Sequence, residues 1–131
     1  MILLDTHTWV WWAADPKKLS RQARLQIDKA QKTDAVAVAT ISCWEVAMLV
    51  AKNRLAFSIE LEDWIGQALE LPSVKLLDLT PKIAILSSQL PGTLHGDPVD
   101  RILVATAKHH SCPLVTKDKK LLAYPHIQSI W

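Results

Sequence analysis

Four acidic residues stand at positions where an α/β chain could bring their side chains together. They are Asp5, Glu45, Asp100 and Asp118. Several carboxylates without a cluster of Cys or His select a hard cation that binds oxygen, so the set predicts Mg²⁺ or Mn²⁺ rather than Zn²⁺. Such an ion typically activates water against a phosphate ester, which makes hydrolysis of a phosphodiester bond the leading hypothesis.

Asp100 is the acid that is hardest to explain as a structural residue. Asp97 and Pro98 have the types preferred at the N-cap and the first position of a helix that we expect to run to about His110. At helical spacing Asp100 lies on the apolar face of this helix, together with Leu103. An ionised carboxylate on an inward face is costly unless it is compensated, as it would be by a cation held among several acids.

The other acids each have a structural alternative. Glu45 fits the last position of a Ser42-x-x-Glu45 capping box, and for Glu45 considered alone this is the favoured interpretation. Asp97 and Asp118 fit helix N-caps, and Asp5 fits an Asx-turn at the end of a strand. These alternatives are independent of one another, whereas a shared site explains the whole set, so the site is preferred.

The elements that must position these acids alternate between strands and helices. We expect strands at 1–5, 35–39, 74–79, 113–116 and 127–130, and helices at 6–14, 20–31, 42–52, 60–70, 81–90 and 98–110, with a short helix after the turn at 117–120. This alternation predicts an α/β, three-layer fold in which a mostly parallel β-sheet is flanked by helices.

The topology of a parallel sheet predicts where the acids meet. Ligands of open parallel sheets bind outside the carboxyl ends of the strands, and helices that follow those strands begin at the same edge. Asp5, Glu45 and Asp118 should therefore converge there. Asp100 joins them only if the loop at 91–97 returns the chain to that edge.

Composition sets further limits on the function. The chain has 131 residues, which suits one domain over residues 1–131, and 50% of them are hydrophobic. A net charge of +2 permits nucleic-acid binding without arguing for it. No apolar run is long enough for a membrane helix, and the first residues lack the basic region of a signal peptide. Cys43 and Cys112 should be reduced core residues, as in a cytoplasmic protein.

The chain resembles the PIN-domain nucleases, and among them the VapC-type ribonuclease toxins of prokaryotic toxin–antitoxin pairs. The resemblance rests on the segments Ile2–Thr8, Ser42–Glu45, His95–Arg101 with Ala105–Ala107, and Leu114–Asp118. Each motif is short, and their order and spacing make the resemblance specific. It implies a parallel sheet flanked by helices, a metal-dependent endoribonuclease, a homodimer, and inhibition by a cognate antitoxin.

The resemblance also implies roles for individual residues. The acidic quartet of the family falls on Asp5, Glu45, Asp100 and Asp118, of which Glu45 would act through water or orient the attacking water. Asp97 is an additional acid and an alternative metal ligand. Thr6 and Thr116 would hydrogen-bond the carboxylates or a water on the metal. Arg101 would bind a substrate phosphate or pair with the neighbouring acids.

The expected substrate is RNA with an accessible, single-stranded segment, because proteins read RNA sequence mainly in such segments. The histidines near the site, His7 and His95, are expected to be structural or solvent-exposed. Most of the six Trp residues should pack in the core. The Trp-rich helices at 7–14 and 41–52 also suggest a groove for an antitoxin helix, with Trp12 and Trp44 as its anchors.

Other function classes fit less well. A haloacid-dehalogenase-like phosphatase needs Asp-x-Asp after its first strand, and position 7 here is His. A receiver domain needs paired acids there, and Asp5 has no acidic neighbour. A non-catalytic module for binding nucleic acid or protein should have lost one of the four acids. A DNA-directed nuclease stays open, because carboxylate-held metals hydrolyse either backbone.

Overall fold

The computed structural model describes residues 1–131 and contains one five-stranded sheet. Its strands are β1 (Ile2–Leu4), β2 (Val36–Ala39), β3 (Val74–Leu77), β4 (Leu114–Val115) and β5 (Ser129–Ile130). The spatial order is β3-β2-β1-β4-β5, and every neighbouring pair is parallel. The chain builds outward from β1 to β3 and then returns to the other side of β1. The order therefore reverses between β1 and β4, which is where open α/β sheets bind ligands.

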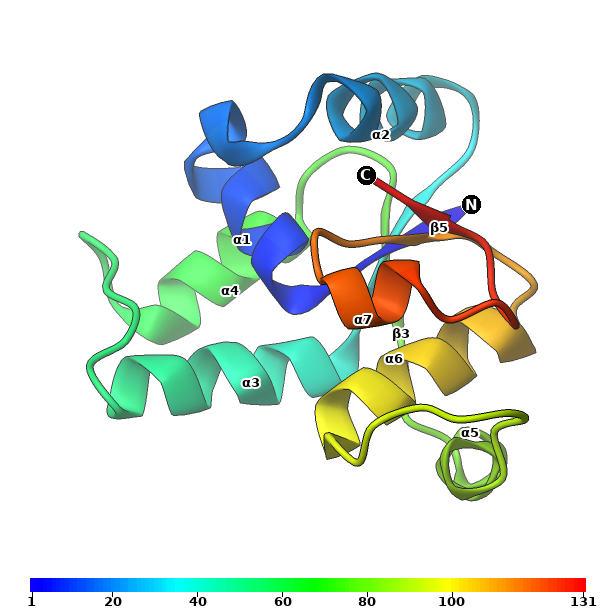
Figure 1. The fold of residues 1–131 in the computed structure, drawn as a ribbon. Coiled ribbons are helices and arrows are strands. Elements are labelled where there is room, and N and C mark those ends of the chain that lie inside the picture. Colours follow the sequence, from blue (N-terminus) through cyan, green and yellow to red (C-terminus); the bar gives the residue numbers. More distant parts are fainter.

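Helices cover both faces of this sheet. They are α1 (Thr6–Ala14), the 3₁₀ turn η1 (Pro16–Lys18), α2 (Arg21–Thr33), α3 (Thr40–Ala51), α4 (Leu61–Leu69), α5 (Pro81–Ser88), α6 (Pro98–His109) and α7 (Lys119–Leu122). Figure 1 shows α1 and α2 on one side of the strands and α5 and α6 on the other. The predicted three-layer α/β fold is confirmed, and the sheet is parallel throughout.

Successive residues of the strands enter two separate cores. Leu4 and Val38 pack in the core formed with α1, α2 and α4. Leu3 and Ala37 point to the opposite face and pack against α5 and α6. Because the central strands are buried on both faces, their sequences are continuous apolar runs rather than alternating patterns. The two cores fix the carboxyl edge of β1 and β4 rigidly from both sides.

One helix boundary differs from the prediction in a way that affects the site. Helix α3 begins at Thr40 instead of Ser42, and its N-cap is Ala39, which has no side chain able to cap it. The capping-box alternative for Glu45 is therefore wrong. Ser42 lies within the first turn of α3 and is fully buried. Its hydroxyl accepts a hydrogen bond of 2.9 Å from the Thr6 hydroxyl.

Most of the remaining differences are shorter elements, although α2 extends to Thr33 instead of residue 31. The third strand ends at Leu77 instead of residue 79, the fifth begins at Ser129 instead of residue 127, and α5 ends at Ser88 instead of residue 90. The strands are short because pairing ends where the neighbouring strand ends: β5 pairs with β4 over two residues only. Cys43 and Cys112 are free thiols, as expected. Cys112 is buried in the core, whereas Cys43 is only partly buried and packs against it.

No helix of the structure combines the length and the hydropathy that crossing a membrane requires.

Candidate active site

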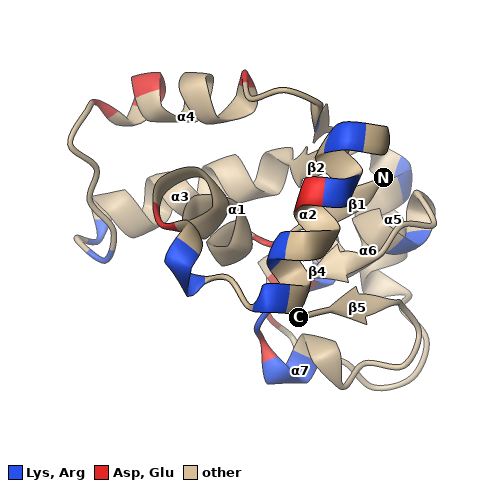
Figure 2. Ribbon diagram, turned by 90° about the horizontal axis from the view of Figure 1, so that it is seen from above, with Lys and Arg blue, Asp and Glu red and all other residues tan.

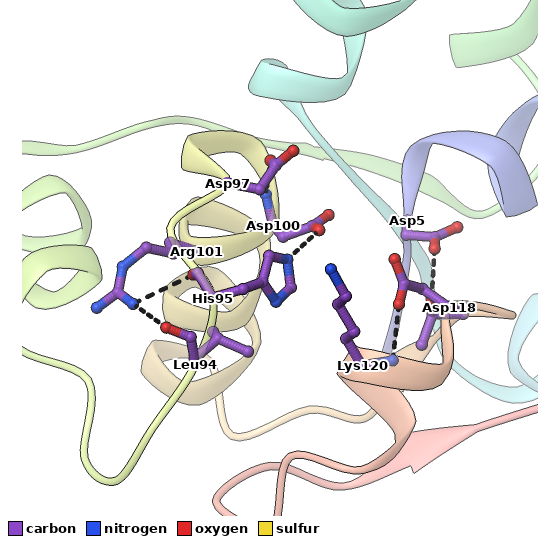
Figure 3. Close-up of polar contacts among 9 residues, drawn as sticks. Asp5, Leu94, His95, Asp97, Asp100, Arg101, Asp118 and Lys120 are labelled. Carbon is purple, nitrogen blue, oxygen red and sulfur yellow. Dashed lines mark hydrogen bonds and ion pairs between the residues drawn. The ribbon is translucent and has the colours of Figure 1, made fainter.

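A cleft of about 440 Å³ opens at the carboxyl edge between β1 and β4. Its walls include all four acids singled out by the sequence and the additional acid: Asp5, Glu45, Asp97, Asp100 and Asp118. Figure 3 shows Asp97, the N-cap of α6, and Asp100, in its first turn, across from Asp5 and Asp118, which follow β1 and β4. The convergence expected from the topology is present, and the loop before α6 does bring Asp100 to this edge.

Asp5 is held from two sides. Its Oδ1 accepts a hydrogen bond of 2.9 Å from the backbone N–H of Thr8 and so caps α1, and its Oδ2 accepts one from the hydroxyl of Thr116. The residue is 8% exposed. Asp5 is thus a helix N-cap rather than the Asx-turn suggested by the sequence, and it also lines the cleft, because one carboxylate can accept several hydrogen bonds.

Thr116 joins the ends of the two central strands. Its buried hydroxyl donates to Asp5 and accepts a hydrogen bond of 3.0 Å from the backbone N–H of Asp118. The Asp118 side chain in turn caps α7 by accepting from the backbone N–H of Lys120 at 2.8 Å. The expected contact between Thr116 and a carboxylate is therefore present. For Thr6 that contact is absent, because its hydroxyl donates to Ser42 inside the fold.

Asp97 and Asp100 share the first turn of α6. The Asp97 side chain caps this helix by accepting from the backbone N–H of Asp100 at 3.0 Å. Nε2 of His95 donates to Oδ2 of Asp100 at 2.7 Å. Burial raises the pKa of Asp100, the hydrogen bond from His95 opposes this, and the charges of Asp97 and Asp118 raise the pKa further. The folded chain thus gathers more negative charge here than its own groups neutralise.

Arg101 corrects one prediction. Its Nε donates to the carbonyl of Ser87 at 2.9 Å, and its Nη1 donates to the carbonyl of Leu94 at 2.9 Å and, more weakly, to that of His95 at 3.4 Å. Figure 3 shows the guanidinium pointing away from the carboxylates. Arg101 therefore forms no ion pair with the acids and is not placed to bind a phosphate in the cleft. It holds the loop that returns the chain to the site, a role suited to its planar fork of donors.

Two side chains of the cleft were not singled out by the sequence. Lys117 and Trp11 both line it, and the Lys117 ammonium lies 5.8 Å from the centre of the Trp11 ring. Their sequence positions could have predicted that they lie near the acids. Lys117 directly follows Thr116 at the end of a strand, and Trp11 lies in the helix that Asp5 caps. Lys117 brings a positive charge and Trp11 an aromatic surface next to the acids.

The donor set fits a hard divalent cation. The cleft is lined by five carboxylates and one lysine, and it offers no thiol. No group of three or more His, Cys, Asp or Glu side chains is drawn together closely enough to form a ready metal cage. Mg²⁺ commonly keeps several of its waters and takes only one or two carboxylates directly, so it suits an open arrangement of acids better than a closed cage.

Comparison with known proteins gives matches along nearly the whole chain. The PIN domain family matches residues 2–127. The chain is 39% identical over 125 residues to the protein named Ribonuclease VapC22 from Mycobacterium tuberculosis, an alignment that covers 95% of this chain and 92% of that protein. All five acids of the cleft lie within the residues that the family matches.

Solved structures that share the fold include two crystal structures. One is a crystal structure of VapBC2 from Rickettsia felis bound to a DNA fragment from their promoter, with a TM-score of 0.73, 18% identity, and coverage of 98% of this chain and 97% of that chain. The other is a crystal structure of FitAcB from Neisseria gonorrhoeae, with a TM-score of 0.68, 21% identity, and coverage of 98% and 96%. At these identities the likeness concerns the fold.

The interactions of Arg101 predict the result of Arg101→Lys. The lysine keeps the charge but cannot reach the carbonyls of Ser87 and Leu94 together, so we expect a loss of about 1–3 kcal/mol in the free energy of unfolding. Urea denaturation measures it. The exposed Arg24 on α2, which donates to the carbonyl of Pro16, provides the comparison, and Arg24→Lys should cost clearly less. Equal stability of Arg101→Lys and the unchanged chain would contradict the role assigned to this residue.

The crowding of carboxylates predicts that Asp100→Asn stabilises the metal-free chain. The substitution removes a charge whose side chain is 21% exposed, and Asn can still accept the hydrogen bond from His95. We expect Tm in a chelator to rise by about 2–5 °C. Mg²⁺ should raise the Tm of the unchanged chain more than that of the variant.

Asp28→Asn, at an exposed position of α2, is the matched control and should leave Tm in a chelator unchanged. A fall in the Tm of Asp100→Asn would mean that the interaction of this carboxylate with His95 outweighs the repulsion from the other acids.

Proposed function

Because the chain belongs to the PIN-domain family, we propose that it is a divalent-metal-dependent endoribonuclease that acts as the toxin of a toxin–antitoxin pair. The observation that carries this proposal is the convergence of Asp5, Glu45, Asp100 and Asp118 on one cleft at the point where the sheet order reverses. The ribonuclease name of the relative from Mycobacterium tuberculosis supports RNA as the substrate. The nuclease would comprise residues 1–131 as one domain.

The side chains in and beside the cleft take different roles. Asp5, Asp100 and Asp118 would hold Mg²⁺ or Mn²⁺, with Asp97 as an alternative ligand. When bound, such an ion supplies a water of lowered pKa and a positive charge for the oxygen that leaves. Thr116 keeps Asp5 in position by its hydrogen bond, and Lys117 attracts the RNA phosphate toward the acids.

The reaction adds one water molecule across a P–O bond of the RNA backbone. The oxygen of the water joins phosphorus, the bond from phosphorus to one ribose oxygen breaks, and that oxygen leaves with a proton. Glu45 lines the cleft from α3, which follows β2, whereas Asp118 follows β4; these two strands lie on opposite sides of β1 in the sheet. We assign Glu45 the orientation of the attacking water. A hydrogen bond from this water to the carboxylate would fix its direction of attack.

The partners follow from the same assignment. Solved structures with this fold include VapBC2 and FitAcB, whose names each join two components. We propose that this chain likewise binds a cognate antitoxin and that it forms a homodimer. Its action on RNA is expected in the cytoplasm, where such a toxin meets its substrate.

Cleavage of a mixed pool of single-stranded RNA by the purified chain tests the proposal. The unchanged chain should cut RNA with Mg²⁺ or Mn²⁺, and a chelator should stop it. Asp100→Asn should lower the rate by about 100-fold or more, because it removes a charge that holds the ion. Asp28→Asn on α2 is the matched control and should cut at the unchanged rate.

Other outcomes exclude parts of the proposal. If Asp100→Asn cuts as fast as the unchanged chain, the acids of the cleft do not form the active site. Cleavage of a DNA pool at the same rate as RNA would favour a nuclease without preference for RNA. If the chain, purified free of any bound protein, cuts neither pool with either metal, the non-catalytic binding module becomes the better explanation.

A further inference from the structure

A second cavity of about 310 Å³ adjoins the acid cleft and lies between α3 and the start of α6. The two cavities share Glu45 and Asp97 as lining residues. Figure 1 shows that α6 begins beside α3, so the second cavity follows α3 away from the sheet edge. A chain-like ligand that reacts at the acids can therefore continue directly into this cavity, which we call the α3 groove.

Trp44 forms the apolar part of the α3 groove together with Met48, one helical turn further along. Trp44 is 54% exposed, whereas Trp9 and Trp64 are buried in the core. The expectation that Trp residues pack in the core is thus wrong for this one. A large aromatic ring left on the surface beside a reaction site is the kind of feature that marks a binding surface.

Two cations line the same cavity. Lys52 and Arg54 lie where α3 ends, and the turn between them is fixed by Asn53, whose φ is 56°, and by a hydrogen bond of 2.9 Å from the backbone N–H of Arg54 to the carbonyl of Leu49. The ion pairs of the structure involve other residues, so both charges are available to a ligand. At 1.5 Å per residue, Lys52 lies about 10 Å along the helix axis from Glu45, which matches roughly three stacked nucleotides.

We propose that single-stranded RNA occupies the α3 groove, with a base stacked on Trp44 and phosphates contacting Lys52 and Arg54. This inference rests on the proposed ribonuclease activity and deepens it, because it assigns the path of the substrate beside the reaction site. An aromatic platform combined with a cationic track is the arrangement by which proteins hold single strands, and stacking tolerates any base.

The distribution of charge favours single-stranded RNA as the ligand of the α3 groove, and it favours a path from the acid cleft along α3. The groove carries two cations at its far end and opens at its near end into the cleft where the reacting phosphate must lie. On the other flank of α3, helix α4 carries Glu62 and Asp63 in its first turn, and Figure 2 shows acidic positions along it. A polyanion would be repelled from α4 and attracted along the α3 groove.

Binding of a fluorescently labelled, single-stranded RNA of mixed sequence tests the inference by anisotropy. All proteins comprise residues 1–131 and carry Asp100→Asn, so that the RNA is not cut. Adding Trp44→Ala should weaken binding by about 5- to 150-fold through the loss of one stacked base, and Trp44→Tyr should restore most of the affinity. Thermal unfolding confirms that each variant is folded.

The two cations are tested through the salt dependence of the same binding. In the double variant Lys52→Ala/Arg54→Ala the plot of log affinity against log salt should become less steep by about 1.4, because about 0.7 is lost for each phosphate contact removed. Lys29→Ala and Lys32→Ala on α2 form the matched pair of controls and should leave the slope unchanged.

Failure of this inference can be told apart from failure of the proposed function. If Trp44→Ala and the double variant bind RNA like the Asp100→Asn parent while the unchanged chain still cuts RNA, the groove assignment is wrong and the ribonuclease stands. If Trp44→Ala loses binding of an antitoxin helix but keeps its affinity for RNA, the groove belongs to the protein partner and the inference is overturned. Since binding is measured without cleavage, its outcome does not depend on the metal-dependent chemistry.

Discussion

The mutual repulsion of carboxylates at one edge of the sheet is the constraint on which this structure depends. The chain brings five acids to a single cleft and supplies one lysine to its lining. Three of these acids are helix N-caps: Asp5 for α1, Asp97 for α6 and Asp118 for α7. In each case backbone N–H groups and the positive end of a helix face the carboxylate, and both stabilise its charge. The fold thus holds the acids together with helix termini.

The order of the strands makes this possible. A helix that follows a parallel strand starts at the carboxyl edge, so α1, α3 and α7 present their N-termini there as a matter of topology. Helix α6 precedes its strand and needs a loop that carries the chain back across the sheet. That loop is held by Arg101 on the carbonyls of Ser87 and Leu94, and by the hydroxyl of Tyr124 on the carbonyl of Pro91. The position of Asp100 therefore depends on contacts outside the cleft.

Much of the fold and of the acid cleft could be predicted from the sequence, because local signals and topology agree. The apolar runs that end in Asp5 and Thr116 mark strands buried on both faces, and their order places the acids at one edge. The start of α3 could not be predicted in this way. The capping-box pattern of Ser42 and Glu45 is a local signal. The position of Ser42 inside the helix instead involves a contact with another helix, because its hydroxyl accepts a hydrogen bond from Thr6 of α1.

Contacts between distant parts of the chain, which local sequence patterns do not show, also explain the other incorrect predictions. Arg101 next to acids suggests an ion pair or a phosphate site, and only the path of the distant loop shows that backbone carbonyls take its donors. Composition counts Trp44 as one more core aromatic, although its ring remains on the surface of α3. Each error concerns a residue whose surroundings come from another part of the chain.

One carboxylate can both cap a helix and bind a metal ion, so the two explanations of an acid are compatible. A carboxylate has two oxygens and about four sites that accept a hydrogen bond or a cation, whereas a helix cap uses one of them. Oδ1 of Asp118 accepts from the backbone N–H of Lys120, and Oδ1 of Asp97 accepts from that of Asp100. Each of these caps leaves Oδ2 available to the cleft. Capping even serves a metal site, because it fixes the side chain rotamer and so reduces the entropy lost when the acid binds an ion. A pattern that predicts a cap at the carboxyl edge of a parallel sheet is therefore evidence for a ligand position there.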